Sequence, residues 1–137
     1  MREILFRGKR ADNGEWVYGD LSKWSNGYFI SLQSQNIKAR THIEVYPETV
    51  GQYTGLKDKN GTEIFEGDIV QTNKFFLPVG LNAKYVIEYD VEIACFIGTM
   101  QKGYVKHFTT FQNDSDQFEV IGNIHDNPEL LNAEGVR

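Results

Sequence analysis

One stretch decides how this chain folds: Tyr53-Thr54-Gly55-Leu56-Lys57-Asp58-Lys59-Asn60-Gly61-Thr62-Glu63-Ile64-Phe65-Glu66-Gly67-Asp68-Ile69-Val70. Asn-Gly pairs favour type I′ turns, in which both central residues have φ > 0, so Asn60-Gly61 predicts a hairpin between strands at 53–58 and 62–65. Gly67 permits a sharp bend, and the Asp68 side chain can hydrogen-bond the turn backbone. A further strand is therefore expected to begin at this Gly-Asp corner.

Two more Asn-Gly pairs precede that stretch. Asn13-Gly14 predicts a hairpin between strands at 3–9 and 15–21, and Asn26-Gly27 predicts that the second of these strands pairs with one at 28–33. Together they predict an N-terminal β-meander.

The most regular strand pattern follows the meander. Between Ile37 and Val45, apolar or small residues alternate with Lys38, Arg40, His42 and Glu44, which is typical of a strand with one buried and one solvent-facing side. Pro47 has no N–H for a ladder, and residues 47–50 suit at most one helical turn. We therefore expect two parts, residues 1–50 and 51–137.

The second part continues with short strands. They are predicted at 84–89, 91–99, 104–111 and 118–124, and this spacing suggests a closed or sandwiched β-structure. Asn127-Pro128-Glu129 has the features of a helix start, so a short C-terminal helix is expected, with Leu130 and Leu131 packed on the barrel. The predicted fold class is mainly β.

Composition limits the function classes. The 137 residues carry a net charge of −5, with +2 on residues 1–60 and −7 on residues 61–137, so nonspecific nucleic-acid binding by the whole molecule is disfavoured. No secretory segment or membrane span is recognisable, which predicts a cytoplasmic protein with no membrane partner. Cys95 stands alone in an apolar stretch and is expected to be a small core residue.

The sequence offers no convincing catalytic, metal or cofactor site. The loop from Asp58 to Glu63 lacks the Gly and Glu positions of an EF-hand, and three widely separated histidines do not have zinc-ligand spacing. Glycines 55, 61 and 67 do not form a phosphate loop. Acids that could serve a carboxylate-dependent hydrolase occur in three groups: Glu66 and Asp68; Glu88, Asp90 and Glu92; Asp114 and Asp116. We interpret them as turn and surface residues, and no catalytic residue, metal or cofactor is expected.

The best candidate contact surface combines bases with aromatic rings. Its members are Lys38, Arg40 and His42 on the regular strand, with Trp16 and Trp24 in the adjoining hairpins. Arg7, Lys9 and Arg10 in the first strand could add charge. Such a face suits an acidic protein partner or single-stranded nucleic acid, and the alternative is a solvated edge with its aromatics in the core.

The quoted stretch also carries a resemblance. With Val50-Gly51-Gln52 before it, it resembles the signature block of the YopX family, and Phe6-Arg7-Gly8-Lys9, Trp16-Val17-Tyr18-Gly19, Val120-Ile121-Gly122-Asn123-Ile124 and Asn127-Pro128-Glu129-Leu130-Leu131 are similar to the ends of that family. The resemblance implies a phage or prophage protein in a bacterial host and supplies no catalytic residues. Glu66-Gly67-Asp68-Ile69-Val70 is similar to the entry of SH3-like barrels, so a small barrel of that type is expected in the second part.

These observations favour one hypothesis over two alternatives. The hypothesis is a non-enzymatic accessory module that binds a protein partner. The alternatives are single-stranded nucleic-acid binding through the basic-aromatic face and a carboxylate-dependent hydrolase. Exposed strand edges also make a homo-oligomer an expectation.

Overall fold

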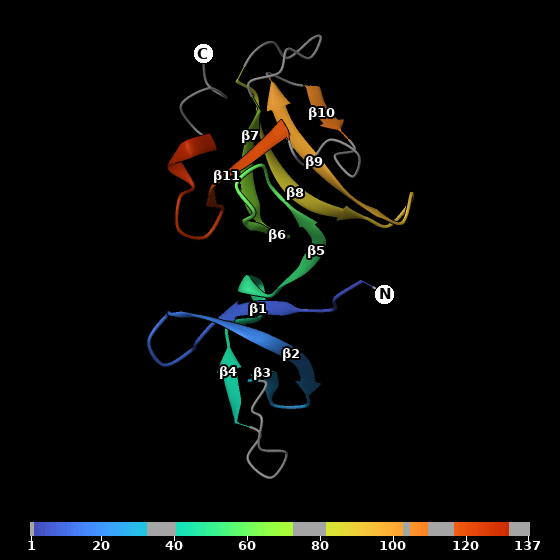
Figure 1. Cartoon of the computed structure of the whole chain (residues 1–137). Coiled ribbons are helices and arrows are strands. Elements are labelled where there is room, and N and C mark those ends of the chain that lie inside the picture. Colours follow the sequence, from blue (N-terminus) through green and yellow to red (C-terminus); the bar gives the residue numbers. More distant parts are fainter. Residues whose placement is uncertain (1, 33–40, 73–81, 103–104, 110–116, 132–137) are drawn as a thin grey trace. The chain divides into compact units, whose positions relative to one another are not determined.

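The computed structural model describes residues 2–32, 41–72, 82–102, 105–109 and 117–131 (Figure 1). The chain divides into two compact units, Met1–Gly55 and Leu56–Arg137. Both consist of antiparallel β-structure, so the mainly β fold class is confirmed. The division falls inside one strand, β5 (Gly51–Lys57), which ends unit 1 and begins unit 2.

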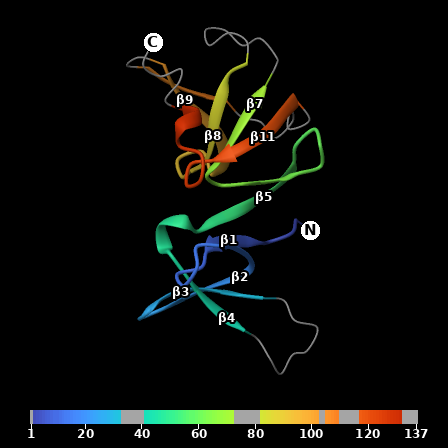
Figure 2. The ribbon, with the colours of Figure 1, turned by 90° about the vertical axis from the view of Figure 1, so that its left-hand side faces the viewer.

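Unit 1 is the predicted meander (Figures 1 and 2). Its strands are β1 (Phe6–Lys9), β2 (Trp16–Trp24), β3 (Gly27–Ser31) and β4 (His42–Val45), followed by a single 3-10 turn, η1 (Pro47–Thr49), and the start of β5. They are arranged in the order β4-β3-β2-β1-β5. Residues 37–40 of the predicted regular strand lie outside the described residues, and β4 is its observed end.

The meander curls because β2 changes partners halfway along. Its first half pairs with β1 up to Phe6↔Gly19, and its second half pairs with β3 from Asp20↔Ser31 onward. At the bend the Ser31 carbonyl lies so close to Gly19 that no Cβ fits there. The end of β4 then returns to β1, where the Tyr46 N–H donates to the Lys9 carbonyl at 2.9 Å. Ile30 and Val45 are buried inside this curl.

The three Asn-Gly hairpins form, but the predicted type I′ turns are wrong. Among the described non-glycine residues only Asn82 and Ala94 have positive φ, so none of the three asparagines adopts the left-handed conformation. In the third hairpin a three-residue loop places Gly61 alone at φ +82, and the Asp58 N–H donates to the Thr62 carbonyl at 2.8 Å. A type I turn followed by one left-handed glycine needs φ > 0 at a single residue, which Gly provides at little cost.

Unit 2 contains the end of β5 and six further strands. These are β6 (Glu63–Phe65), β7 (Asp68–Thr72), β8 (Lys84–Asp90), β9 (Cys95–Lys102), β10 (Val105–Thr109) and β11 (Phe118–Asn123). The last five form a sheet in the order β10-β9-β8-β7-β11. Pairing between described residues does not close this sheet into a barrel, and the SH3-like barrel stays a prediction. Residues 129–131 are helical, in agreement with the predicted short C-terminal helix, and residues 132–137 lie outside the described residues.

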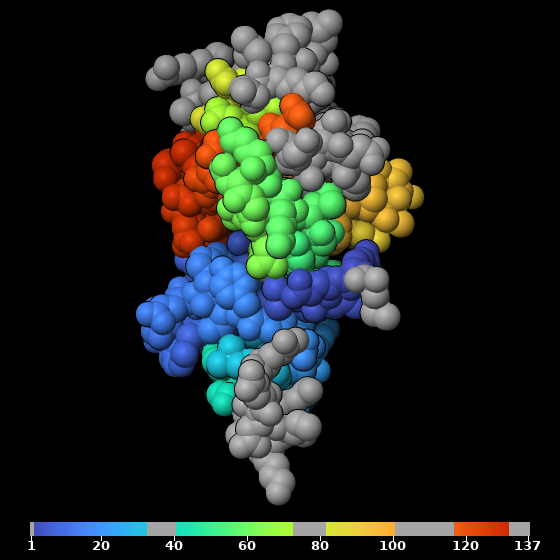
Figure 3. Space-filling model, viewed as in Figure 1, coloured from blue at the N-terminus to red at the C-terminus, as the bar shows by residue number. Residues whose placement is uncertain are grey.

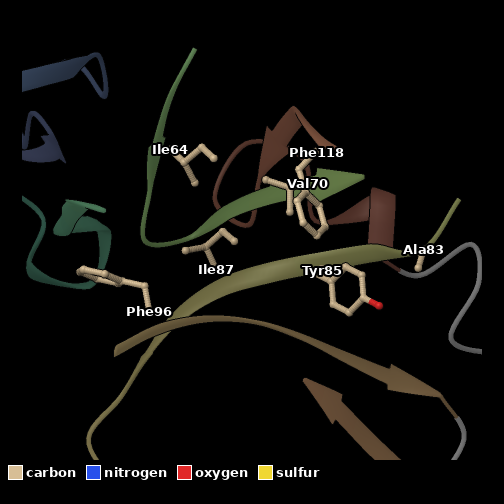
Figure 4. Close-up of a cluster of buried hydrophobic side chains, with 7 residues drawn as sticks. All are labelled: Ile64, Val70, Ala83, Tyr85, Ile87, Phe96 and Phe118. Atoms are coloured by element: carbon tan, nitrogen blue, oxygen red, sulfur yellow. The ribbon is translucent and has the colours of Figure 1, made fainter. Parts of the chain in front are cut away.

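The core of unit 2 lies on one face of this sheet (Figure 4). It is built from side chains that are at most 8% exposed: Ile64, Val70, Ala83, Tyr85, Ile87, Phe96 and Phe118. The Tyr85 and Phe118 rings meet edge to face with their centroids 6.1 Å apart. Cys95, expected in a core, is half-buried at the start of β9.

One predicted strand boundary is wrong. β9 begins at Cys95 rather than at Val91, and residues 91–94 form the loop of the β8–β9 hairpin. Val91 and Ile93 are typical strand residues, but the Asp90 carboxylate accepts a hydrogen bond from the Glu92 N–H at 2.9 Å and fixes a turn there.

Candidate functional site

The predicted basic-aromatic face is only partly described. Lys38 and Arg40 lie outside the described residues, while His42, Trp16 and Trp24 are on strands of unit 1. The structure does not gather these three into one group. Trp16 lies at the start of β2 with residues of β1, and Trp24 lies at the end of β2 with residues of β3 and β4.

Trp16 is contacted by cations from its own sheet. The guanidinium carbon of Arg7 lies 4.5 Å from the ring centroid, and Lys9 Nζ lies 5.4 Å from it. Lys9 stands directly opposite Trp16 in the β1–β2 register. A cation over an indole contributes about 0.5–1 kcal/mol when exposed and more when desolvated. Trp16 and the two bases therefore stabilise the β1–β2 pair, which leaves less of the ring for a ligand.

Trp24 has a different environment. It is 59% exposed, although it is one of the largest apolar side chains in the protein. Its ring meets Phe29 edge to face at 6.2 Å and meets the ring of His42 at 6.1 Å, with interplanar angles of 67° and 65°. Gly27, opposite Trp24 in the register, has no side chain to compete for this space. The indole is therefore supported from two sides while it remains exposed to solvent.

Polar groups complete this surface. His42 Nδ1 lies 2.8 Å from the hydroxyl oxygen of buried Ser31, which fixes the orientation of the imidazole. Glu44 stands opposite Phe29 in the β3–β4 register, so its carboxylate is on the same side of the sheet. We call Trp24, Phe29, His42 and Glu44 the Trp24 face. Sequence reasoning placed Glu44 on the solvent side of its strand but did not include it in the candidate site.

Arg10, a candidate contributor of positive charge, is paired within its own loop. Its Nε donates to Asp12 Oδ1 at 2.9 Å and its Nη2 donates to Asp12 Oδ2 at 2.8 Å. The bidentate contact raises the pKa of Arg10 and lowers the pKa of Asp12. The pair leaves little net positive charge at this corner of unit 1.

The loop that superficially suggested calcium binding uses its carboxylate on its own backbone. Asp58 Oδ1 accepts from the N–H groups of Asn60 and Thr62 at 2.8 and 2.9 Å, and Oδ2 accepts from the Val120 N–H at 2.9 Å. Both oxygens are engaged, and Asp58 is 6% exposed. The carboxylate joins the β5–β6 turn to β11.

Among the acids considered for hydrolysis, those that the structure describes have different surroundings. Asp68 is buried, and its Oδ2 accepts from the Phe65 N–H at 2.8 Å. Glu88, Asp90 and Glu92 line a hollow in unit 2, and Asp114 and Asp116 lie outside the described residues. No group of three His, Cys, Asp or Glu side chains in the described part of the chain could hold a metal ion. The same residues contain no helix of the length and apolar character that crossing a membrane requires.

Comparisons with known proteins place this geometry in a family. No curated protein matches the chain. Among solved structures, the chain is similar to the crystal structure of protein EF1440 from Enterococcus faecalis, with 27% sequence identity, a TM-score of 0.54, and coverage of 96% of this chain and 99% of that one. The profile of the YopX family, described as YopX protein, matches residues 5–132. The chain therefore belongs to the YopX family.

Proposed function

We propose that this protein is a non-enzymatic accessory module, encoded by a phage or prophage, that binds a protein partner through the Trp24 face. The observation that carries the proposal is the 59% exposure of Trp24 beside Phe29 and His42. Tryptophan, with tyrosine and arginine, is enriched among the interface residues that dominate binding energy. Truncation of a tryptophan that serves as such an anchor typically costs at least about 2 kcal/mol of binding free energy.

The charge of this surface favours a protein over a nucleic acid. Glu44 is part of the Trp24 face, and Asp20 stands opposite Ser31 on the same side of the sheet. Unit 1 as a whole has seven Lys or Arg and six Asp or Glu, a net charge of +1. Phosphate binding depends on accumulated positive charge, whereas aromatic anchors with mixed polar neighbours are typical of protein interfaces.

The test is recovery of a stoichiometric partner from bacterial host lysate by the tagged protein, with the affinity then measured for the purified pair. Trp24→Ala should weaken binding about thirtyfold or more, since a hot-spot residue contributes at least about 2 kcal/mol. Ile4→Ala is the matched control, because Ile4 is 57% exposed in the same unit but outside the Trp24 face. A partner that binds Trp24→Ala as tightly as the parent protein would overturn the proposal.

Two further assays on the purified protein test the nucleic-acid and hydrolase alternatives. Tryptophan fluorescence during titration with a single-stranded oligonucleotide at low salt should show no saturable change. Binding that falls steeply with salt and with Arg40→Glu would instead support nucleic-acid recognition. Turnover of a small molecule without a stoichiometric partner would support the hydrolase alternative.

A further inference from the structure

The loop of the β8–β9 hairpin departs from ordinary turn chemistry. Its four residues are Val91-Glu92-Ile93-Ala94, although turns favour Gly, Asn, Asp, Ser and Pro. Val91 is 81% exposed and Ile93 is 52% exposed. Ala94 has φ +54, a conformation that costs a non-glycine residue about 1–2 kcal/mol. Departures from local rules of this kind concentrate at functional sites.

The loop nevertheless has a defined shape. Asp90 Oδ1 accepts from the Glu92 N–H at 2.9 Å and from the Ile93 N–H at 3.4 Å, and Asp90 pairs with Cys95 across the hairpin. Below the loop the Tyr89 and Phe96 rings meet edge to face at 5.2 Å. In the space-filling view this yellow-to-orange hairpin end lies at the right-hand margin (Figure 3). Its exposed side chains are therefore presented on a preformed support.

A hollow lies against the face of this hairpin that carries Ile97 and Thr99. Its volume is about 410 Å³, and buried Ile97 and Thr99 line it together with Val91. The acidic residues Glu88, Asp90 and Glu92 also line it. Glu88 stands directly opposite Ile97 in the register, so acidic and apolar groups are adjacent.

We propose that the β8–β9 hairpin end is a second docking surface, and that its occupant is an extended segment of a partner protein carrying Lys or Arg next to an apolar side chain. Exposed Val91 and Ile93 supply apolar contact area, and the acidic residues of the loop, Asp90 and Glu92, match a basic neighbour. Unit 2 has thirteen Asp or Glu and seven Lys or Arg, a net charge of −6, which attracts a basic segment from a distance. The surface is in unit 2, so it is separate from the Trp24 face.

The experiment uses the full chain and a displayed library of random dodecapeptides as the probe. Selection on the parent protein, with counter-selection on Val91→Ser/Ile93→Ser, should enrich peptides that combine Lys or Arg with apolar residues. Glu92→Lys should weaken a selected peptide about tenfold, and its binding should weaken further with salt. Glu129→Lys and Ile124→Ser are the matched controls, since both residues are exposed in unit 2 outside the hollow.

Several outcomes would overturn this proposal. They are enrichment of acidic or uncharged peptides, the absence of any peptide that depends on the hairpin end, and equal weakening by the control variants. Sedimentation of the parent and of Val91→Ser/Ile93→Ser tests whether the occupant is a second copy. If the parent protein is a dimer and the variant is a monomer, the occupant of this surface is a second copy of the chain, and the proposed basic segment is wrong. Trp24→Ala should leave the selected peptides bound, so failure of this proposal and failure of the Trp24 face are distinguishable.

Discussion

Replacing Asp58 by alanine should destabilise unit 2 more than any surface substitution in it. The Asp58 carboxylate accepts three backbone hydrogen bonds of 2.8–2.9 Å, two within its own turn and one from Val120. A hydrogen bond to a charged group contributes about 1.5–3 kcal/mol. In the alanine variant water can reach the exposed turn N–H groups, so the Val120 N–H, which is less accessible, should account for most of the loss. We expect a decrease in the free energy of unfolding of about 3–5 kcal/mol.

Asparagine at position 58 separates the two parts of this effect. Its amide oxygen can still accept from the turn, while its NH₂ group would face the Val120 N–H donor. Asp58→Asn should therefore cost less than alanine, about 2–3 kcal/mol, and should specifically lower the hydrogen-exchange protection of the Val120 amide. Glu119→Gln is the control, because it removes the exposed 3.5 Å Lys59–Glu119 ion pair at the same junction and should cost under about 1 kcal/mol.

The assay is urea unfolding followed by far-ultraviolet circular dichroism and, separately, by tryptophan fluorescence. Both tryptophans are in unit 1, so the fluorescence transition reports on that unit alone. Asp58→Ala should shift the circular-dichroism transition to lower urea. If Asp58→Ala and Glu119→Gln shift the circular-dichroism midpoint equally, the Asp58 carboxylate does not stabilise the contact between the β5–β6 turn and β11.

Three further perturbations test other parts of the structure. Burial raises the pKa of Tyr85 above its ordinary 10.0, so the unfolded chain loses the phenol proton at lower pH than the folded chain. The free energy of unfolding should therefore fall as the pH rises above about 10, and in urea unfolding at alkaline pH it should fall less steeply for Tyr85→Phe. Gly61→Ala should cost about 1–2 kcal/mol, because Gly61 has φ +82 with open space around it; a neutral result in urea unfolding would contradict the turn geometry. Gly19→Ala should cost about 3 kcal/mol, because its Cβ would meet the Ser31 carbonyl; an unchanged fluorescence midpoint would show that β2 is not tightly bent there.

Much of the strand order could be predicted from sequence because the determining signals are local. Each of the three Asn-Gly pairs lies in or beside an observed hairpin turn, and the alternation ending at Val45 predicts the faces of β4. The turn type was not predictable from the Asn-Gly dipeptide. A hairpin loop needs only one left-handed glycine when a neighbouring side chain, such as that of Asp58, accepts hydrogen bonds from the loop backbone. The bond from Asp58 to Val120 joins residues 62 positions apart, and no periodic pattern carries that information.

The sequence could predict only some of the contacts among the residues of the candidate surface. Trp24 and His42 were both expected on the aromatic side of unit 1, and they meet at 6.1 Å. Trp16 was expected with them, but β2 changes partners at Gly19, so Trp16 instead meets Arg7 and Lys9. A bend caused by the close approach of Ser31 is a property of packing, which residue type and spacing do not encode.

The residues that resemble the family signature and the residues that we propose for binding are different sets. Asp58, Gly61 and Asp68 belong to the stretch that resembles the family signature, and each is occupied in turn or backbone contacts. The exposed apolar groups at Trp24 and Val91 lie outside that stretch, where no turn or core requirement explains them. A scaffold fixed by buried backbone contacts tolerates change at exposed positions far better than in those contacts. Under the two proposals above, the partner should therefore be sought through substitutions at Trp24 and in the β8–β9 hairpin rather than in the signature stretch.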